Sequence, residues 1–168
     1  MRNYKDYHFR LAAQNDTSHI KNLNEIWQPQ NVTEANKDEG YLSLQYSIND
    51  LGTIIQNQEI VVSTINDEII GYYLLNNYCP TPKRQEGLDV ISKMKSEGII
   101  DNSVRVGIGA QVVVDKNHQG KGISRQLLEV LCETVKPKYD LLYSSLSKLH
   151  PKGYAVHTKE GWQVLYES

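Results

Sequence analysis

The sequence predicts a single domain of the α/β (α+β) class. Runs rich in β-branched residues alternate along the chain with segments whose apolar residues recur at helical spacing. At 168 residues the chain is long enough for one core and too short for two ordinary domains, so residues 1–168 are treated as one unit. An apolar fraction of 39% and a net charge of -2 fit a globular protein and give no basic excess that would indicate nucleic-acid binding.

Composition also argues against several kinds of site and location. The longest apolar runs, such as residues 69–75, are far shorter than a membrane span, and the N-terminus lacks the apolar core of a signal peptide. Cys79 and Cys132 fall in different predicted elements without Cys-x-x-Cys spacing, which argues against a disulfide framework or a zinc site. We therefore expect a cytoplasmic protein with no metal and with no membrane or nucleic-acid partner.

The first third of the chain is predicted to form a strand and two helices. Tyr7–Ala13 alternates as a strand, and the side-chain oxygens of residues 15–17 are placed to cap a following helix that Pro29 ends. Residues 30–40 are polar and aperiodic, which predicts a mobile loop. A weaker apolar stripe over residues 48–55 predicts a short second helix.

A hairpin followed by an insertion is predicted next. Ile60–Ile65 is β-branched and apolar, Asn66-Asp67 is a turn, and Glu68–Tyr78 is a second strand. Prolines then break the strand, and the apolar residues of segment 86–97 lie about one helical turn apart among charges. We interpret residues 80–103 as an insertion that contains an amphipathic helix.

The last third begins with an extended run over Val104–Asp115. Gly107 and Gly109 within it indicate a bulge or the close approach of another backbone or ligand. A glycine turn over residues 119–124 leads into a helix that Pro137 stops. Three further elements are predicted: a strand over residues 140–145, a helix from Pro151 that Gly161 closes, and a strand over Trp162–Tyr166.

Residues 112–124 carry the clearest chemical signal, because an apolar strand runs there through the glycine turn into a helix. Gly120 and Gly122 let backbone N–H groups converge at the positive end of that helix, which favours an anion such as a diphosphate. Lys121 either adds positive charge or simply lies in solvent. The turn has neither the nucleotide P-loop pattern nor the dinucleotide fingerprint, which weakens those two alternatives.

The turn Gln119-Gly120-Lys121-Gly122-Ile123-Ser124 resembles the Gln/Arg-x-x-Gly-x-Gly/Ala signature of the GCN5-related N-acetyltransferase (GNAT) superfamily, with Ser124 in place of the usual Gly or Ala. The order of predicted elements resembles that family over the whole chain. The resemblance implies a mixed, mostly antiparallel twisted sheet flanked by helices, with an inserted helix between the third and fourth strands.

The same resemblance implies acetyl-CoA as cosubstrate. Backbone amides near Val112, Val113 and Val114 would pair with pantetheine and polarise the thioester carbonyl. The pyrophosphate would be held by the turn, which comprises Gln119, Gly120, Lys121, Gly122, Ile123 and Ser124. Arg125 would reach a phosphate or lie in solvent.

Acyl transfer to an amine depends more on positioning and amide donors than on many side chains. In the family the acid is commonly a Tyr four residues before a Gly-aromatic pair, and counting back from Gly161-Trp162 reaches His157. His157 could donate a proton as imidazolium or be a packed helix residue. Tyr154, on the same predicted helical face, is the better acid by chemistry, and no carboxylate stands out as the base.

We therefore predict an N-acyltransferase that moves an acetyl group from acetyl-CoA to a primary amine of a small molecule or peptide. An acyl-CoA-binding regulatory module with weak or no activity is the alternative, and a phosphate-ligand binder sharing only the glycine turn is a third. The insertion could cover the acceptor cleft, form a homodimer surface or decorate the exterior. A second subunit could also cover the sheet edge left beside Trp162–Tyr166.

Overall fold

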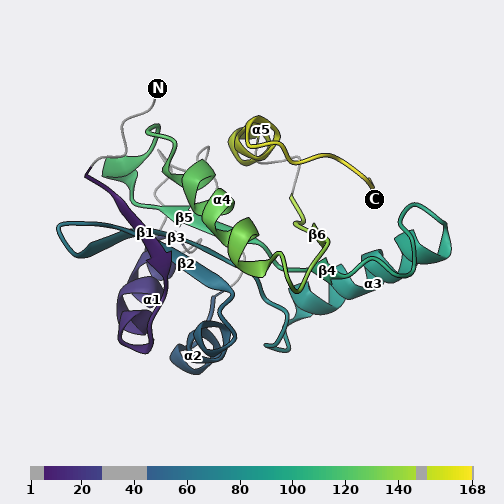
Figure 1. Ribbon diagram of the computed structural model, residues 1–168, viewed down its shortest axis with the longest axis horizontal. Coiled ribbons are helices and arrows are strands. Elements are labelled where there is room, and N and C mark those ends of the chain that lie inside the picture. The colour runs from purple at the N-terminus through teal and green to yellow at the C-terminus, as the bar shows by residue number, and fades with distance from the viewer. Residues whose placement is uncertain (1–5, 28–44, 147–150, 168) are drawn as a thin grey trace.

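The computed structural model describes residues 6–27, 45–146 and 151–167 and has the expected α/β class, a largely antiparallel sheet flanked by helices α1 to α5 (Figure 1). The main sheet is antiparallel throughout, with strand order β1-β2-β3-β5. Its strands are β1 (His8–Leu11), β2 (Ile60–Ile65), β3 (Glu68–Leu74) and β5 (Gln111–Val114). A second sheet pairs β4 (Val106–Gly107) with β6 (Leu141–Leu142) in parallel.

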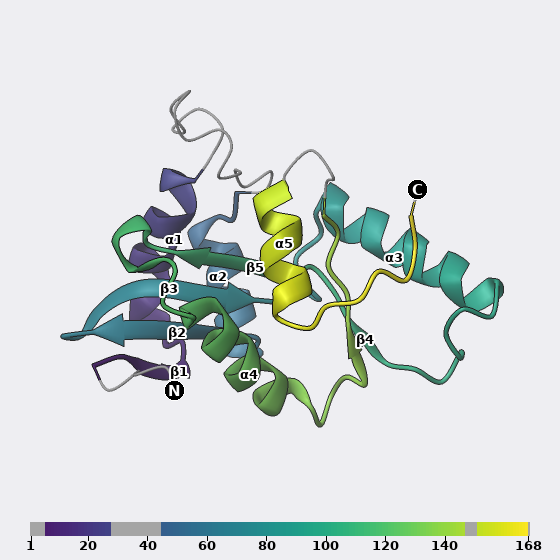
Figure 2. The ribbon, with the colours of Figure 1, turned by 90° about the horizontal axis from the view of Figure 1, so that it is seen from above.

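Helices cover both faces of the main sheet. Figure 1 shows α1 (Thr17–Ile26) and α2 (Ile48–Gln56) below the sheet, and α4 (Ile123–Val135) with α5 (Pro151–Lys159) above it. The predicted insertion contains α3 (Pro82–Ser96), which lies between β3 and β4 in the chain as expected and extends away from the main sheet beside β4 (Figure 2).

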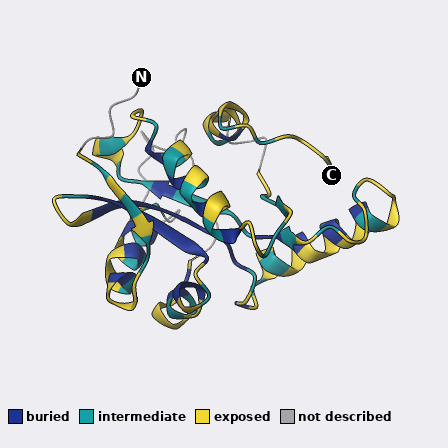
Figure 3. Cartoon of the chain, viewed as in Figure 1, coloured by how far each residue is buried: buried dark blue, intermediate teal, exposed yellow. Residues whose placement is uncertain are grey.

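The core consists of two layers because successive residues of a strand point to opposite faces. Val62, Tyr72 and Val113 pack in the layer under α1 and α2. Val61 and Tyr73 pack with the apolar face of α4 in the other layer. Both faces are therefore covered, which explains why β2 and β3 are almost continuously buried (Figure 3).

The hairpin prediction is confirmed, with Ile60 opposite Leu74. Asn66 and Asp67 have positive φ angles of 49° and 63°, as a tight two-residue hairpin turn requires. The second strand is shorter than predicted and ends at Leu74. Two residues later the Asn76 amide donates to the carbonyl of Ile108 at 2.8 Å, so the chain leaves the hairpin there.

The extended run predicted over Val104–Asp115 is divided between two sheets, because β4 joins the small sheet and β5 joins the main sheet. The chain turns at Gly109, whose φ is +78°. A Cβ there would lie 2.9 Å from Cβ and 3.0 Å from the amide nitrogen of Asn76. The close backbone approach inferred from the glycine is thus confirmed.

Several predicted boundaries change. The first strand is shorter than Tyr7–Ala13, the strand at 140–145 reduces to β6, and α3 begins at Pro82 because Thr81 Oγ1 accepts a hydrogen bond from the amide of Arg84. Asp16 does not cap α1 through its side chain. Its carboxylate instead accepts bonds from the Ala13 amide and the Arg10 guanidinium. Pro29 and the predicted loop at 30–40 lie outside the described residues.

The predicted final strand over Trp162–Tyr166 is also wrong. This segment pairs with no strand among the residues that the structure describes. Its side chains hold it to helices instead, because the Trp162 ring packs 5.5 Å from the His157 ring and the Lys93 ammonium donates to the Tyr166 hydroxyl. Within the described ranges, no helix has the length and apolar character needed to cross a membrane.

Candidate active site

The N-terminus of α4 is built to expose backbone amides. Gly120 and Gly122 take left-handed conformations with φ of 75° and 78°, and Gly122 immediately precedes the helix. The first intrahelical bond runs from the Gln126 amide to the Gly122 carbonyl, so the amides of residues 123–125 have no partner within the helix. Buried Ile123 anchors this turn in the core. Among the described residues, no side chain caps this helix end, which leaves it suited to an anion.

The loop before α4 is fixed from β5. The Asp115 amide donates to the Ile70 carbonyl at 2.7 Å, and the Asp115 carboxylate accepts from the Asn117 amide at 2.9 Å. Gln119 Nε2 donates to the Val114 carbonyl at 3.1 Å. The Gln119 side chain thus ties the glycine turn to the strand, and its role here is to shape the loop.

Lys121 and Arg125 differ in their surroundings. Lys121 Nζ donates to the Tyr7 hydroxyl at 3.3 Å, and that hydroxyl also lies 2.9 Å from His118 Nδ1. Tyr7 was not predicted as part of the site, because it is 111 residues from His118 in sequence. Arg125 pairs with Glu129 at 3.4 Å at the surface of α4.

Strand β5 presents the backbone on which a coenzyme could lie. Val112, Val113 and Val114 pair with Tyr73, Tyr72 and Gly71 across one edge. Since β5 is the last strand of the main sheet, its other edge faces no strand in the described part of the chain. At the start of this edge, the Ala110 amide donates to the Tyr143 carbonyl at 3.5 Å. The edge of β5 at Val112–Val114, which pairs with no described strand, is therefore suited to an extended ligand.

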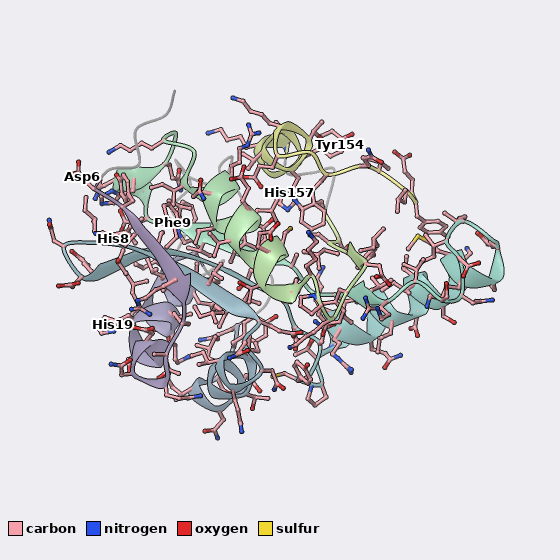
Figure 4. The ribbon with its side chains drawn as sticks, viewed as in Figure 1. Asp6, His8, Phe9, His19, Tyr154 and His157 are labelled. Atoms are coloured by element: carbon pink, nitrogen blue, oxygen red, sulfur yellow. The ribbon has the colours of Figure 1, made fainter. Side chains whose placement is uncertain are left out.

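The two predicted acid residues occupy different environments on α5 (Figure 4). His157 is 8% exposed, and its Nδ1 lies 2.9 Å from the Gly153 carbonyl. Burial lowers the pKa of His157, so the imidazole is neutral at pH 7 with Nδ1–H donating to that carbonyl. Tyr154 is 43% exposed. The two side chains therefore differ in their exposure to solvent, although both lie on the helix expected to carry the acid.

A buried polar network on the opposite face of the sheet escaped the sequence analysis. Asn24 Nδ2 donates to the Tyr72 hydroxyl at 3.0 Å, and that hydroxyl donates to Gln111 Oε1 at 2.8 Å. Burial raises the pKa of Tyr72, so the phenol stays protonated. The network joins α1 to the first residue of β5, where no local pattern reveals it.

Ser124 is engaged by a residue that the sequence analysis did not single out. Its hydroxyl donates to Glu160 Oε1, which connects the first turn of α4 to the residue that follows α5. No group of three or more metal-ligating side chains occurs within residues 6–27, 45–146 and 151–167. The candidate site is therefore made of backbone amides, a free strand edge and the side chains of α5.

Comparison with known proteins identifies this arrangement. Residues 20–151 match the family model described as the Acetyltransferase (GNAT) family, and no curated protein matches the chain in sequence. The structure of yncA, an acetyltransferase of Salmonella typhimurium solved with its cofactor acetyl-CoA, has a TM-score of 0.62 at 14% identity, covering 95% of this chain and 80% of that one.

Two further neighbours are named for different acceptors. Aminoglycoside N-acetyltransferase AAC(6')-Iy in complex with CoA gives a TM-score of 0.63 at 14% identity, covering 96% of this chain and 91% of that one. Ribosomal-protein-alanine N-acetyltransferase of Brucella melitensis biovar Abortus 2308 gives 0.56 at 13% identity, with 96% of each chain covered. At these identities the structures support the fold, and the family assignment comes from the matched model. The chain belongs to the GNAT family of acetyltransferases.

Proposed function

We propose that this protein transfers an acetyl group from acetyl-CoA to a primary amine, by direct attack of the amine on the thioester. The observation that carries the proposal is the N-terminus of α4, which no described side chain caps, beside the edge of β5 at Val112–Val114 that pairs with no described strand. In this proposal the diphosphate sits on the amides of residues 119–125, and pantetheine extends along Val112–Val114. Neighbours solved with acetyl-CoA or CoA support the choice of cosubstrate.

The chemistry follows from this placement. A neutral amine attacks the thioester carbonyl, and the new C–N bond forms through a tetrahedral oxyanion. The nitrogen loses a proton to a base or to water, and the C–S bond then breaks to release the thiolate. Backbone N–H groups of β5 stabilise the oxyanion. A thiol pKa of about 8.5 makes the thiolate a fair leaving group, so protonation by an acid adds a moderate acceleration.

Tyr154 and His157 are the proposed catalytic side chains. The exposed Tyr154 phenol has a proton to give to the departing thiolate. His157 is neutral and keeps Nδ1–H on the Gly153 carbonyl, which leaves Nε2 as an acceptor. We therefore assign the acid role first to Tyr154, with His157 accepting or relaying a proton.

The acceptor is proposed as a primary amine of a small molecule or a peptide. Among the neighbours, one is named for aminoglycosides and another for the alanine of a ribosomal protein, so the same fold occurs with both kinds of acceptor. A panel of amines assayed by free-thiol release from acetyl-CoA tests the proposal. Thiol release that depends on an added amine is the expected result, and release with none of them would contradict it.

Matched variants test the catalytic assignment. Tyr154→Phe is expected to lower kcat by about tenfold while the Kd for acetyl-CoA stays the same, because it removes only the acidic proton. His157→Ala should also lower kcat more than it weakens binding. Tyr78→Phe is the control, since Tyr78 is 41% exposed against 43% for Tyr154 and lies outside α5. Unchanged kcat in both α5 variants would remove this helix from the acid role.

An acyl-CoA-binding regulatory module is a second candidate, favoured by the buried neutral His157 where the family commonly has Tyr. Acetyl-CoA binding without transfer to any amine would support it. Calorimetry with coenzyme A, ATP and NAD separates both candidates from a general phosphate binder. The acetyltransferase and the regulatory module each require that, of these three ligands, only coenzyme A binds tightly.

Two further properties are proposals of the same kind. We place the protein in the cytoplasm, which the unpaired thiols of Cys79 and Cys132 support. A homodimer is supported by the exposure of Val164 and Leu165 in the unpaired C-terminal segment, at 54% and 44%. Sedimentation at micromolar concentration distinguishes monomer from dimer.

A further inference from the structure

Glu160 brings a carboxylate to the first turn of α4. It follows α5 directly, and its amide donates to the Val156 carbonyl at 3.0 Å. The Ser124 hydroxyl donates to Glu160 Oε1 across 36 residues of sequence. Because Ser124 is the second residue of α4, the carboxylate lies at the positive end of this helix, where negative charge is favoured.

The second oxygen of this carboxylate is poorly satisfied. Glu160 Oε2 is buried and has no hydrogen-bond partner among the described residues. An ionised carboxylate in such a place is costly, because a buried oxygen has lost water without gaining a donor. Burial accordingly raises the pKa of Glu160.

The groups that face Glu160 come from every element around it. Arg125 of α4 lowers the pKa of Glu160 but is itself paired with Glu129. Tyr73 of β3 is a neutral phenol, and Trp162 is an uncharged donor. His157 of α5 packs on the Trp162 ring and is neutral at pH 7. Protonation of Glu160 is therefore opposed first by the hydrogen bond from Ser124, then by Arg125, and also by the positive end of α4.

A diphosphate on the same helix end would change this balance. A phosphate bound to the first-turn amides would lie roughly 6–8 Å from the carboxylate, as hydrogen-bond lengths through Ser124 dictate. We infer that Glu160 is a residue of the coenzyme site, where its carboxylate competes with the diphosphate for the end of α4 and takes up a proton when the coenzyme binds. This inference rests on the proposed function, because it assumes that the diphosphate binds at α4.

Proton uptake by Glu160 on binding makes the affinity for the coenzyme depend on pH. Bound diphosphate raises the pKa of Glu160 further, so affinity is highest where Glu160 is protonated in both states. Affinity falls as the pH rises from the pKa of the free protein to that of the complex, and it is constant above the latter. Dephospho-coenzyme A is the appropriate ligand, because the 3′-phosphate of coenzyme A itself titrates near pH 6, about the second pKa of a phosphate monoester.

The experiment is titration calorimetry with dephospho-coenzyme A between pH 5 and pH 8, in pairs of buffers that differ in ionisation heat. The wild-type protein should take up protons on binding and lose affinity by about tenfold across this range, as two charges at this separation predict. Glu160→Gln keeps an oxygen for Ser124 and should bind about tenfold tighter at pH 8, without pH dependence. Glu97→Gln, at the residue that follows α3, removes the same charge elsewhere and should behave as wild type.

Proton uptake and coenzyme binding are measured separately, so the role of Glu160 and the proposed function can fail independently. Tight binding with no proton uptake by wild type, or the same pH profile in Glu160→Gln, would overturn the inference and leave coenzyme binding intact. Failure of wild type to bind either dephospho-coenzyme A or coenzyme A would overturn the proposed function as well. If the Glu160→Gln variant folds poorly, the absence of proton uptake by wild type still overturns the inference.

Discussion

Replacing Gly109 with Ala tests the junction at which β4 and β5 separate. The new Cβ would lie 2.9 Å from Asn76 Cβ and 3.0 Å from its amide nitrogen. Asn76 has little freedom to move, because its amide donates to the Ile108 carbonyl at 2.8 Å and its side chain donates to the Cys79 carbonyl at 3.1 Å. The methyl group must therefore push two backbone segments apart.

Two costs add at this position. A left-handed conformation costs a non-glycine residue about 1–2 kcal/mol, of which the stiffer unfolded chain returns about 0.4–1 kcal/mol. Forcing a carbon into a packed backbone contact costs about 2 kcal/mol more. Gly109→Ala should thus lose about 3 kcal/mol of unfolding free energy, which corresponds to a fall in Tm of about 9 °C for a chain of this size.

Gly98→Ala is the matched control. Gly98 has φ of +71°, close to the +78° of Gly109, but its added Cβ would meet no atom within 4 Å. Gly98→Ala therefore has only the conformational cost of a left-handed backbone, and its Tm should fall by about 3 °C. Thermal unfolding followed by circular dichroism measures both variants. Equal losses would refute the argument that close packing at Asn76 fixes the junction.

Two further predictions concern the phosphate turn and the small sheet. Gly120→Ala places a side chain at φ of +75° in open space, so the added backbone strain should weaken coenzyme A binding by about tenfold in calorimetry. Gly98→Ala should bind coenzyme A normally. Unchanged affinity of Gly120→Ala would contradict a role for the glycine turn in holding the diphosphate. Hydrogen bonds from Arg105 hold the pKa of Asp140 at about 2, below its unfolded value, so this pair stabilises the fold above about pH 4 and the contribution is lost as pH falls toward 2. Asp140→Asn should be less stable than wild type at pH 7 and converge with it near pH 2 in urea titrations, and a constant difference would exclude this linkage.

Much of the fold was predictable because its signals are local. The hairpin depends on alternation and on a two-residue turn, and both are visible within residues 60–74. Helix α4 is visible as one apolar stripe, and its anion-binding start needs only two glycines with positive φ. The predicted boundaries of β1 and β6 were less accurate, since a strand ends where its partner strand no longer provides hydrogen bonds.

The site was predictable on its coenzyme side and less so elsewhere. Val112–Val114 and the turn before α4 occur as one continuous segment, so their proximity was assured by chain connectivity. The environment of His157 was not predictable, because its burial against Trp162 and its hydrogen bond to the Gly153 carbonyl depend on how α5 packs. Tyr154, three residues away, received the opposite exposure for the same reason.

The sequence by itself determined the class of fold, the hairpin, the helix α4 and its glycine turn, since each follows from periodicity or backbone freedom within a few residues. Tertiary structure alone decided that Val104–Asp115 divides between two sheets, that Trp162–Tyr166 pairs with helices through its side chains, and that Glu160 meets Ser124. Those outcomes depend on contacts between distant segments, whose energies no local pattern records.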